Sequence, residues 1–381
     1  MVDTLEPAAN AQNLEIRFSI HLATRDQLAA YRAFATKAVA GAAQHPLWVE
    51  CWLAASGSRG HILWMTRGDE PVAAWPLEEA QQSGVRALRF VGRSHANGNF
   101  GAQARNARGV VSIEDAKAAI RAALPDIHML SLERQRDEIE GETNLMSLLA
   151  SRESPNIALA ASLTGGFPGL LERANGKKKN KKRRAQQRKF EDAGGFHLRQ
   201  AATPEEVDAI LDAFFRMKRA RFEKAGITDV FGDDEVKAFW RDLFKASLDE
   251  SPRPFTLETL EVGGHIRAIT GSSHLGDRTV CEFGVIEDDD LASISPGEFL
   301  AYSNIETSCS AGLDFYDFSV GDEAYKRSWC DTEIVHFDVV VPLTNRGRIA
   351  AGANAVLASA KHAIKSRPAL WALAKKIRER L

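Results

Sequence analysis

One stretch of the sequence, DFYDFSVGDEAYKRSW, gathers polar side chains of several chemical types between apolar elements. Two of its carboxylates, Asp317 and Asp322, have the chemistry to orient an acceptor or to take a proton from it. Lys326 and Arg327 carry the charge that holds a phosphate or a carboxylate. Tyr325 stands directly before this pair of cations. We therefore predict that the cluster is functional, with roles that are interchangeable among its members.

A further candidate is Glu282, on a strand predicted over residues 279–286. Val280 and Gly284 share its face, because side chains alternate along a strand. Partial burial there would raise the pKa of the carboxyl group toward the value that suits a general base near neutral pH. The alternative is an ordinary exposed carboxylate.

After this strand and a loop, the sequence predicts a helix that begins at Pro296. Ser295 is a natural N-cap, and Glu298 stands three residues later, as a capping box requires. The first turn of a helix offers free N–H groups and the positive end of the helix dipole, so it can bind a phosphate or pyrophosphate. The alternative is an ordinary capped helix, in which Glu298 competes with an anion for the same donors.

Three sequence motifs together resemble one protein family. S-P-G-x-x-L is followed about twenty residues later by D-F-x-x-G-D-E-x-Y-K-x-x-W, and F-x-x-M-K-x-x-R-F-E-K-A-G covers residues 214–226. The set resembles the bacterial GNAT-like acetyltransferases of the CelD/BcsL type, which are associated with cellulose and exopolysaccharide synthesis and have the FemAB-like transferases as relatives. The resemblance extends from about residue 180 to 340 and is weaker over 14–165.

This resemblance implies an acyltransferase with acyl-CoA, in particular acetyl-CoA, as co-substrate. Ser295, Pro296 and Gly297 match the place where the cofactor pyrophosphate lies in GNAT folds. Tyr325 matches the tyrosine that many GNAT enzymes place near the departing thiolate; the alternative is an aromatic side chain packed beside Trp329. The implied acceptor is an amine or hydroxyl of a saccharide, a lipid-linked precursor or another cell-envelope precursor.

Two other functions stay open at this point. The chain lacks the glycine-rich Q/R-x-x-G-x-G/A loop of typical GNAT enzymes. One alternative is therefore a FemAB-like transferase that uses aminoacyl-tRNA as donor. The other is a non-catalytic accessory protein of polysaccharide synthesis.

The run KKKNKKRRAQQRK over residues 177–189 holds nine basic residues in thirteen and no acidic one. Its charges lie all round a helical wheel, so it lacks the apolar face of a membrane-inserting helix. Candidate partners are the phosphates of CoA, an acidic carrier protein, an anionic membrane surface and, in the alternative function, tRNA. A solvated connector helix is the simpler interpretation.

The order of predicted elements repeats. In each part a strand is followed by two helices and then by antiparallel strands, which predicts an α+β fold of two tandem GNAT-like domains with mixed, largely antiparallel sheets and a C-terminal helical tail. The expected divisions are a flexible N-terminus (1–13), a degenerate GNAT-like domain (14–165), a basic connector helix (166–195), a GNAT-like acyltransferase domain (196–345) and basic C-terminal helices (346–381).

Composition adds limits to these predictions. The chain has 381 residues with 44% apolar content and a net charge of −2, which suits two folded domains. Its four cysteines form no C-x-x-C pair and no H-x-x-H motif is present, so the sequence predicts no metal site. Without a signal peptide or a long apolar run, we expect a soluble cytoplasmic protein, with peripheral attachment to the inner membrane face as the alternative.

Overall fold

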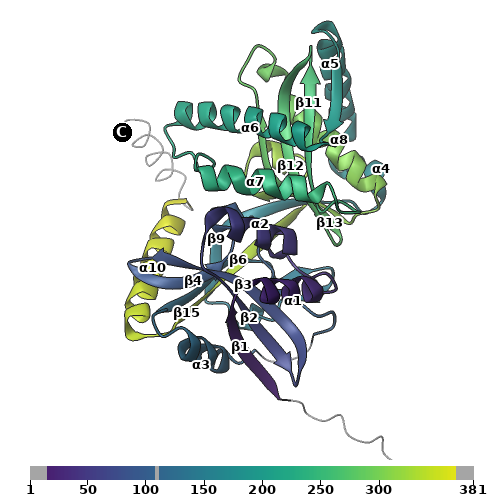
Figure 1. Ribbon diagram of the computed structural model, residues 1–381. Coiled ribbons are helices and arrows are strands. Elements are labelled where there is room, and N and C mark those ends of the chain that lie inside the picture. Colours follow the sequence, from purple (N-terminus) through teal and green to yellow (C-terminus); the bar gives the residue numbers. More distant parts are fainter. Residues whose placement is uncertain (1–14, 108–110, 366–381) are drawn as a thin grey trace, which may run out of the picture.

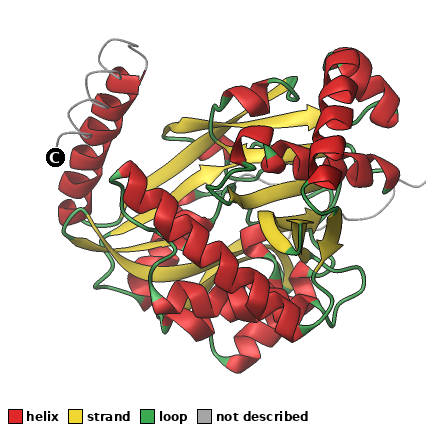
Figure 2. Cartoon of the chain, turned by 90° about the horizontal axis from the view of Figure 1, so that it is seen from above, coloured by secondary structure: helices red, strands yellow, loops and turns green. Residues whose placement is uncertain are grey.

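The computed structural model describes residues 15–107 and 111–365. A mixed sheet of 13 strands runs through both halves of the chain, in the order β1-β2-β3-β4-β6-β15-β9-β14-β13-β12-β11-β10, with β5 paired to β3 (Figure 1). Figure 2 shows helices on both sides of these strands. Among the described residues, no helix is long and apolar enough to cross a membrane.

The first half contributes most of the strands at one end of this sheet. Its strands are β1 (Ile16–Leu22), β2 (Gly60–Arg67), β3 (Glu70–Gln82), β4 (Val85–Phe90), β5 (Ala102–Gln103), β6 (Met129–Gln135) and β9 (Arg152–Ser162), and β7 (Glu138–Ile139) pairs separately with β8 (Glu142–Thr143). Its helices are α1 (Arg25–Ala35), α2 (Pro46–Ser56) and α3 (Ile113–Ala123).

The second half repeats this order after two connecting helices, α4 (Gly166–Arg173) and α5 (Gly176–Asp192). Its strands are β10 (Phe196–Gln200), β11 (Phe255–Val262), β12 (His265–Leu275), β13 (Arg278–Ile286), β14 (Phe315–Val320) and β15 (Thr332–Pro342). Its helices are α6 (Pro204–Ala225), α7 (Asp234–Ser247), α8 (Pro296–Ser310) and the short α9 (Ala324–Arg327), followed by α10 (Asn345–Lys365).

The two halves exchange their last strands. β15, from the end of the second half, pairs antiparallel with β6 of the first, and β9, from the end of the first half, pairs antiparallel with β14 of the second. β9 and β15 also pair with each other. The expected domain limits follow the order of the chain and stay a prediction, whereas in space each half is completed by a strand from the other.

Helices of both halves share one hydrophobic core. The ring of Trp48 on α2 lies 5.0 Å from that of Phe239 and 5.2 Å from that of Trp240, both on α7. These three side chains are at most 1% exposed. Burial of aromatic rings of this size contributes several kcal/mol, so this packing holds the halves together independently of the sheet.

A buried ion pair crosses the boundary at the exchanged strands. Arg136, which follows β6, donates from Nη2 to Oδ2 of Asp317 on β14 at 2.5 Å. Their side chains are 4% and 0% exposed. Gly98 lies against the guanidinium, since a Cβ at this position would stand 2.6 Å from Nε of Arg136. A side chain at residue 98 would therefore displace the pair.

Most predicted elements are present. The strands of both halves, the helix that begins at Pro296 and the basic helix all form. A single 3-10 turn, Ser147–Leu149, separates β8 from β9, and α9 follows β14. The predicted tail is helical through Lys365. The rest of the tail, 366–381, and the N-terminus predicted as flexible, 1–13, lie outside the described residues.

We predict that Arg136→Met lowers the free energy of unfolding by about 3–5 kcal/mol, because it leaves the buried carboxylate of Asp317 without its partner. Chemical denaturation of the full chain measures this loss. Arg216→Met is the matched control, since it removes a pair with Glu287 in which the arginine side chain is 61% exposed, and it should cost at most about 1 kcal/mol. Equal effects of the two substitutions would contradict the prediction.

Candidate functional site

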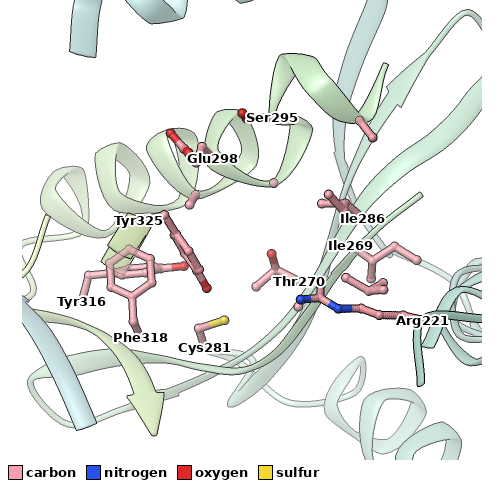
Figure 3. Close-up of a pocket in the computed structure, with 15 residues that line it drawn as sticks. Arg221, Ile269, Thr270, Cys281, Ile286, Ser295, Glu298, Tyr316, Phe318 and Tyr325 are labelled. Atoms are coloured by element: carbon pink, nitrogen blue, oxygen red, sulfur yellow. The ribbon is translucent and has the colours of Figure 1, made fainter. Parts of the chain in front are cut away.

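The strands β13 and β14 open a wedge in the sheet. Their parallel pairing covers three residue pairs and ends at Val280 and Asp317. Beyond this point β14 continues beside β9, while β13 continues beside β12. A cavity of about 320 Å³ lies where the two strands diverge (Figure 3). Its lining includes backbone and side chains of β12, β13, β14, α8 and α6.

The start of α8 forms one end of this cavity. Ser295, Gly297 and Glu298 line it, and within the described chain the N–H of Gly297 has no acceptor. A Cβ on Gly297 would lie 2.8 Å from Cγ2 of Ile286, so a larger residue would have to displace that side chain. Free N–H groups at a helix start attract anions, and this one faces an open space.

The predicted capping box is wrong. Ser295 has a left-handed backbone with φ of 63°, and its side chain caps no N–H of α8. The carboxylate of Glu298 instead accepts from Nζ of Lys182 on α5 at 2.6 Å. Because Glu298 has a cationic partner, it no longer competes for the donors of the first turn. The helix start is thus more available to an anion than the sequence predicts.

Helix α5 holds this helix start in place. Gln186 donates from Nε2 to the carbonyl oxygens of Ile294 and Ser295 at 2.7 and 3.1 Å. Arg183 donates to the carbonyl oxygen of Phe299 at 2.5 Å and lies over its ring. The basic connector is therefore a packed element on one face, which corrects the simpler interpretation of a fully solvated helix.

Arg221 brings a free cation to the cavity. It lies on α6 and lines the cavity beside Thr270 of β12 (Figure 3). Within the described residues it has no acidic partner. The sequence places Arg221 in the family motif over 214–226 but does not distinguish it from the solvated arginines nearby. Arg221 reaches the cavity because α6 passes beside the open end of the cavity between β13 and β14.

Tyr325 is the only member of the predicted polar cluster that lines this cavity among the residues described. Its hydroxyl points into the space in Figure 3. Burial raises the pKa of Tyr325 above its usual range, so the phenol stays protonated at neutral pH and can donate a hydrogen bond. Its ring packs at 6.0 Å from that of Phe318.

The other members of the cluster have partners elsewhere. Lys326 is 5% exposed; its ammonium donates to the carbonyl oxygen of Val320 at 2.9 Å and pairs with Glu323 at 3.0 Å. Arg327 pairs with Asp322 and Glu333 at the surface. Contact with Arg327 also lowers the pKa of Asp322. The structure therefore does not bring these three predicted residues to the cavity.

Glu282 points away from the cavity, toward the first half. It accepts hydrogen bonds from Oγ of Ser273 at 2.7 Å and from Nδ2 of Asn97 at 2.9 Å. Burial raises the pKa of Glu282 to about 7, while these two hydrogen bonds and the charge of Arg136 act in the opposite direction. It lines a narrow crevice between the halves together with Gly98 and Arg136. A carboxyl group with this pKa can act as a general base.

Two further buried groups lie beside this crevice. Asp317, predicted as a catalytic carboxylate, pairs with Arg136 and accepts the N–H of Ser319 at 2.6 Å. His336 is fully buried, and neither ring nitrogen has a partner among the described residues. Burial lowers the pKa of His336 to about 3, so it is neutral. The ionisable groups at this crevice are therefore the ion pair of Arg136 with Asp317, the neutral His336 and the carboxyl group of Glu282.

The sequence indicates that Asn97, in the glycine-rich loop over residues 92–101, could approach a ligand, but it does not predict the contact of Asn97 with Glu282. Asn97 lies 185 positions from Glu282 and binds both its carboxylate and its carbonyl oxygen.

Cys281 lines the cavity at α8, and burial raises the pKa of its thiol to about 12. It is therefore a poor nucleophile at neutral pH.

Comparison with known proteins agrees with this geometry. The family model described as the acetyltransferase (GNAT) domain matches residues 177–327. The crystal structure of FemX is similar to 84% of this chain and 97% of its own, with a TM-score of 0.51 and 11% identity. The C-terminal domain of a putative lysylphosphatidylglycerol synthetase from Agrobacterium fabrum is similar over 88% and 96%, with a TM-score of 0.51 and 10% identity. None of the curated proteins matches the sequence.

A tandem GNAT protein of the clavulanic acid pathway is similar over 87% of this chain and 99% of its own, at 12% identity and a TM-score of 0.46. The predicted fold class is confirmed in that the chain is a mixed α/β protein, its two halves repeat one order of elements and a helical tail follows, while the match to the GNAT domain covers residues 177–327. The resemblance is confirmed at the level of the GNAT domain.

We predict that Glu282 makes the stability of the protein depend on pH. Its pKa is raised from 4.5 to about 7 in the folded chain, so between these values the folded state keeps a proton that the unfolded state has released. Stability should therefore fall as pH rises through this window, by up to about 3 kcal/mol. Glu282→Gln should remove this term.

Denaturation of the wild type and of Glu282→Gln at several pH values between 4 and 8.5 measures the difference. Glu138→Gln, at an exposed glutamate, is the control and should leave the pH dependence unchanged. A difference between wild type and Glu282→Gln that stays constant with pH would rule out the raised pKa.

Proposed function

We propose that the protein is an acyltransferase that moves an acyl group, in particular acetyl, from acyl-CoA to an amine or hydroxyl. The observation that carries this proposal is the wedge between β13 and β14, with the uncapped start of α8 at one end and Tyr325 lining its wall. The match of residues 177–327 to the GNAT domain supports it.

The donor fits the cavity in one direction. Its pyrophosphate would lie at Ser295, Pro296 and Gly297, where the free N–H of Gly297 and the helix dipole favour an anion. Arg221 adds positive charge to the same cavity. The pantetheine arm would follow β13, whose edge has no strand partner beyond Val280 on the side of β14. The thioester then reaches the narrow end of the wedge.

The chemistry needs two proton transfers. A base removes the proton of the acceptor amine or hydroxyl as it attacks the thioester carbonyl, and an acid protonates the thiolate that leaves. Glu282, with a pKa of about 7, is the proposed base, and the protonated phenol of Tyr325 is the proposed donor to the thiolate. Asp317 acts through its pair with Arg136 as a positioning residue.

Finer features of the function remain our proposals. The acceptor is a saccharide or a lipid-linked precursor of the cell envelope, which enters from the side of Glu282. Such an acceptor also contacts Asp322, Lys326 and Arg327 if their ion pairs open. In the structure Lys326 pairs with Glu323 and Arg327 pairs with Asp322. The reaction takes place in the cytoplasm or at the inner face of the membrane.

We predict that acetyl-CoA binds the full chain and that Gly297→Glu weakens binding by more than about tenfold, because the new carboxylate occupies the anion position at the start of α8. Isothermal titration measures both affinities. Gly352→Glu is the matched control, since Gly352 lies on α10 with no atom near its Cβ position, and it should bind like the wild type.

Circular dichroism must show that Gly297→Glu is folded for this comparison to count. If the folded variant binds acetyl-CoA as tightly as the wild type, or if the wild type releases no heat with it, the donor assignment is wrong.

A second candidate function follows from the outer face of α5. Six exposed cations on this face have no acidic partner among the described residues. They are Lys177, Lys178, Lys181, Arg184, Arg188 and Lys189. Their spacing puts them within one broad arc of the helix. Lys182, at the border of this arc, and Arg183, beyond it, contact α8. A stripe of this kind suits the phosphates of a polyanion, which favours aminoacyl-tRNA as an alternative donor.

We predict for this alternative that tRNA binding falls steeply with salt and that a triple variant, Lys178→Glu, Lys181→Glu and Arg184→Glu, reduces the salt slope by about one unit for each phosphate that the protein no longer neutralises. Filter binding at several salt concentrations measures the slope. Lys117, on the distant helix α3, provides the control Lys117→Glu. Acyl transfer from CoA that the triple variant performs normally would exclude tRNA as the donor.

A further inference from the structure

The first half repeats the wedge of the second half. β4 and β6 pair in parallel over three residue pairs, and the pairing ends at Arg89 and Ser131. A cavity of about 200 Å³ lies beyond this point, between the ends of the two strands and the loop that follows β4. It is separate from the cavity at α8, and no residue lines both.

Three arginines line this cavity: Arg89, Arg93 and Arg134. Arg89 donates from Nε to the buried carboxylate of Glu78 at 3.0 Å, and Arg93 pairs with Glu235 on α7. Both guanidinium groups keep N–H donors beyond these bonds. Two of the three charges are thus balanced inside the protein.

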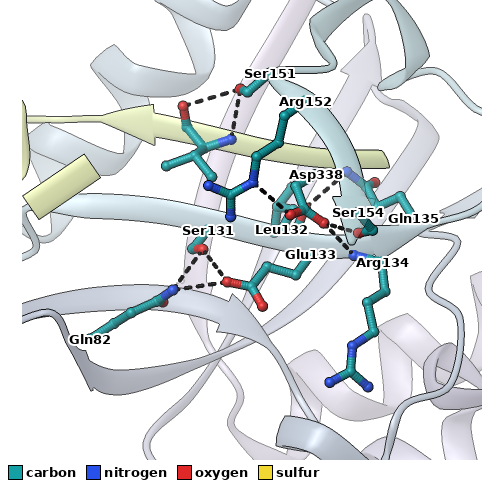
Figure 4. A network of polar contacts seen from close by, with 11 residues as sticks. Gln82, Ser131, Leu132, Glu133, Arg134, Gln135, Ser151, Arg152, Ser154 and Asp338 are labelled. Carbon is teal, nitrogen blue, oxygen red and sulfur yellow. Dashed lines mark hydrogen bonds and ion pairs between the residues drawn. The ribbon is translucent and has the colours of Figure 1, made fainter. Parts of the chain in front are cut away.

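Arg134 forms no ion pair among the described residues. Its Nη1 donates to the carbonyl oxygens of Ser94 and Ala96 at 3.1 and 3.0 Å, and no acidic side chain pairs with it in the part of the chain that is described. The one carboxylate in the lining, Glu133, accepts from Gln82 at 2.9 Å and from Ser131 at 3.2 Å (Figure 4). These neutral donors hold the carboxylate of Glu133 toward Gln82 and Ser131, so that it forms no ion pair with Arg134.

The backbone of Arg134 is fixed in an unusual conformation. Its φ of 54° lies in the left-handed region, which costs energy for a residue with a side chain. Asp338 on β15 accepts its N–H at 2.9 Å and is held in turn by Arg152 at 3.0 Å. Figure 4 shows the guanidinium of Arg134 pointing away from Asp338. The network therefore directs this side chain over the loop at the cavity.

We propose that this cavity in the first half binds a small oxyanion, a phosphate or a carboxylate group, on Arg134 with the spare donors of Arg89 and Arg93. The planar fork of an arginine matches both kinds of oxyanion. The cavity differs from the one in the second half because its donors are side chains and none of its lining residues lies on an α-helix. The site is independent of the proposed acyl transfer.

Ser94 gives the sharpest test, because it is exposed at the rim of the cavity and its side chain makes no hydrogen bond among the described residues. Isothermal titration of the full chain uses two probes, inorganic phosphate and malonate, and the tighter one identifies the class of oxyanion. Ser94→Glu should weaken binding at least about tenfold by charge repulsion, while the neutral control Ser94→Gln should bind like the wild type. Arg134→Gln should also weaken binding, and Arg134→Lys should weaken it less.

Inorganic phosphate can also bind at the start of α8, so the titration is repeated in Gly297→Glu. Binding that persists in this variant and is lost on adding Ser94→Glu supports the site in the first half. Binding that Gly297→Glu abolishes, equal affinities of Ser94→Glu and Ser94→Gln, or no binding of either probe would overturn the proposal.

Discussion

The exchange of β9 and β15 is the constraint on which the rest of the structure depends. An edge strand carries unpaired N–H and C=O groups, and without the exchange β6 and β14 would each present such an edge. Because each half completes the other, neither sheet is finished alone. The register shifts at this boundary, between Asp317 and Val320 and between Phe337 and Val339, let polar side chains into the interior. The buried ion pair of Arg136 with Asp317 lies at this boundary.

The same boundary explains why the sheet opens. A bulge bends β14 at Ser319, whose φ is 58°, and the carboxylate of Asp317 takes the freed N–H at 2.6 Å. The strand then follows β9 and leaves β13. The bend in β6 is similar, with Arg134 in the left-handed region and Asp338 as the acceptor. Each cavity thus exists because a carboxylate stabilises a bend in the strand beside it.

The sequence predicts the elements well because their signals are local. Periodicity, caps and turn residues identify the repeated order of strands and helices, and Pro296 marks the start of α8. The partners of charged residues cannot be predicted this way. Ser295 has the right type for a cap, yet its backbone is left-handed and Lys182, more than a hundred residues earlier in the chain, binds Glu298. The exchange of strands leaves no local signal, since nothing in the sequence of β15 identifies β6 as its partner.

The first half then has a physical role in the proposed chemistry. Burial is the main cause of the raised pKa of Glu282, and the loop with Asn97 and Gly98 supplies part of the surface that covers it. Arg136, also from the first half, acts on this pKa in the opposite direction. A base near neutrality requires both effects at once, because burial alone would keep the carboxyl protonated and full solvation would make it too weak a base. The first half, which lies outside the match to the GNAT domain, therefore helps to set the pKa of Glu282 in the second half.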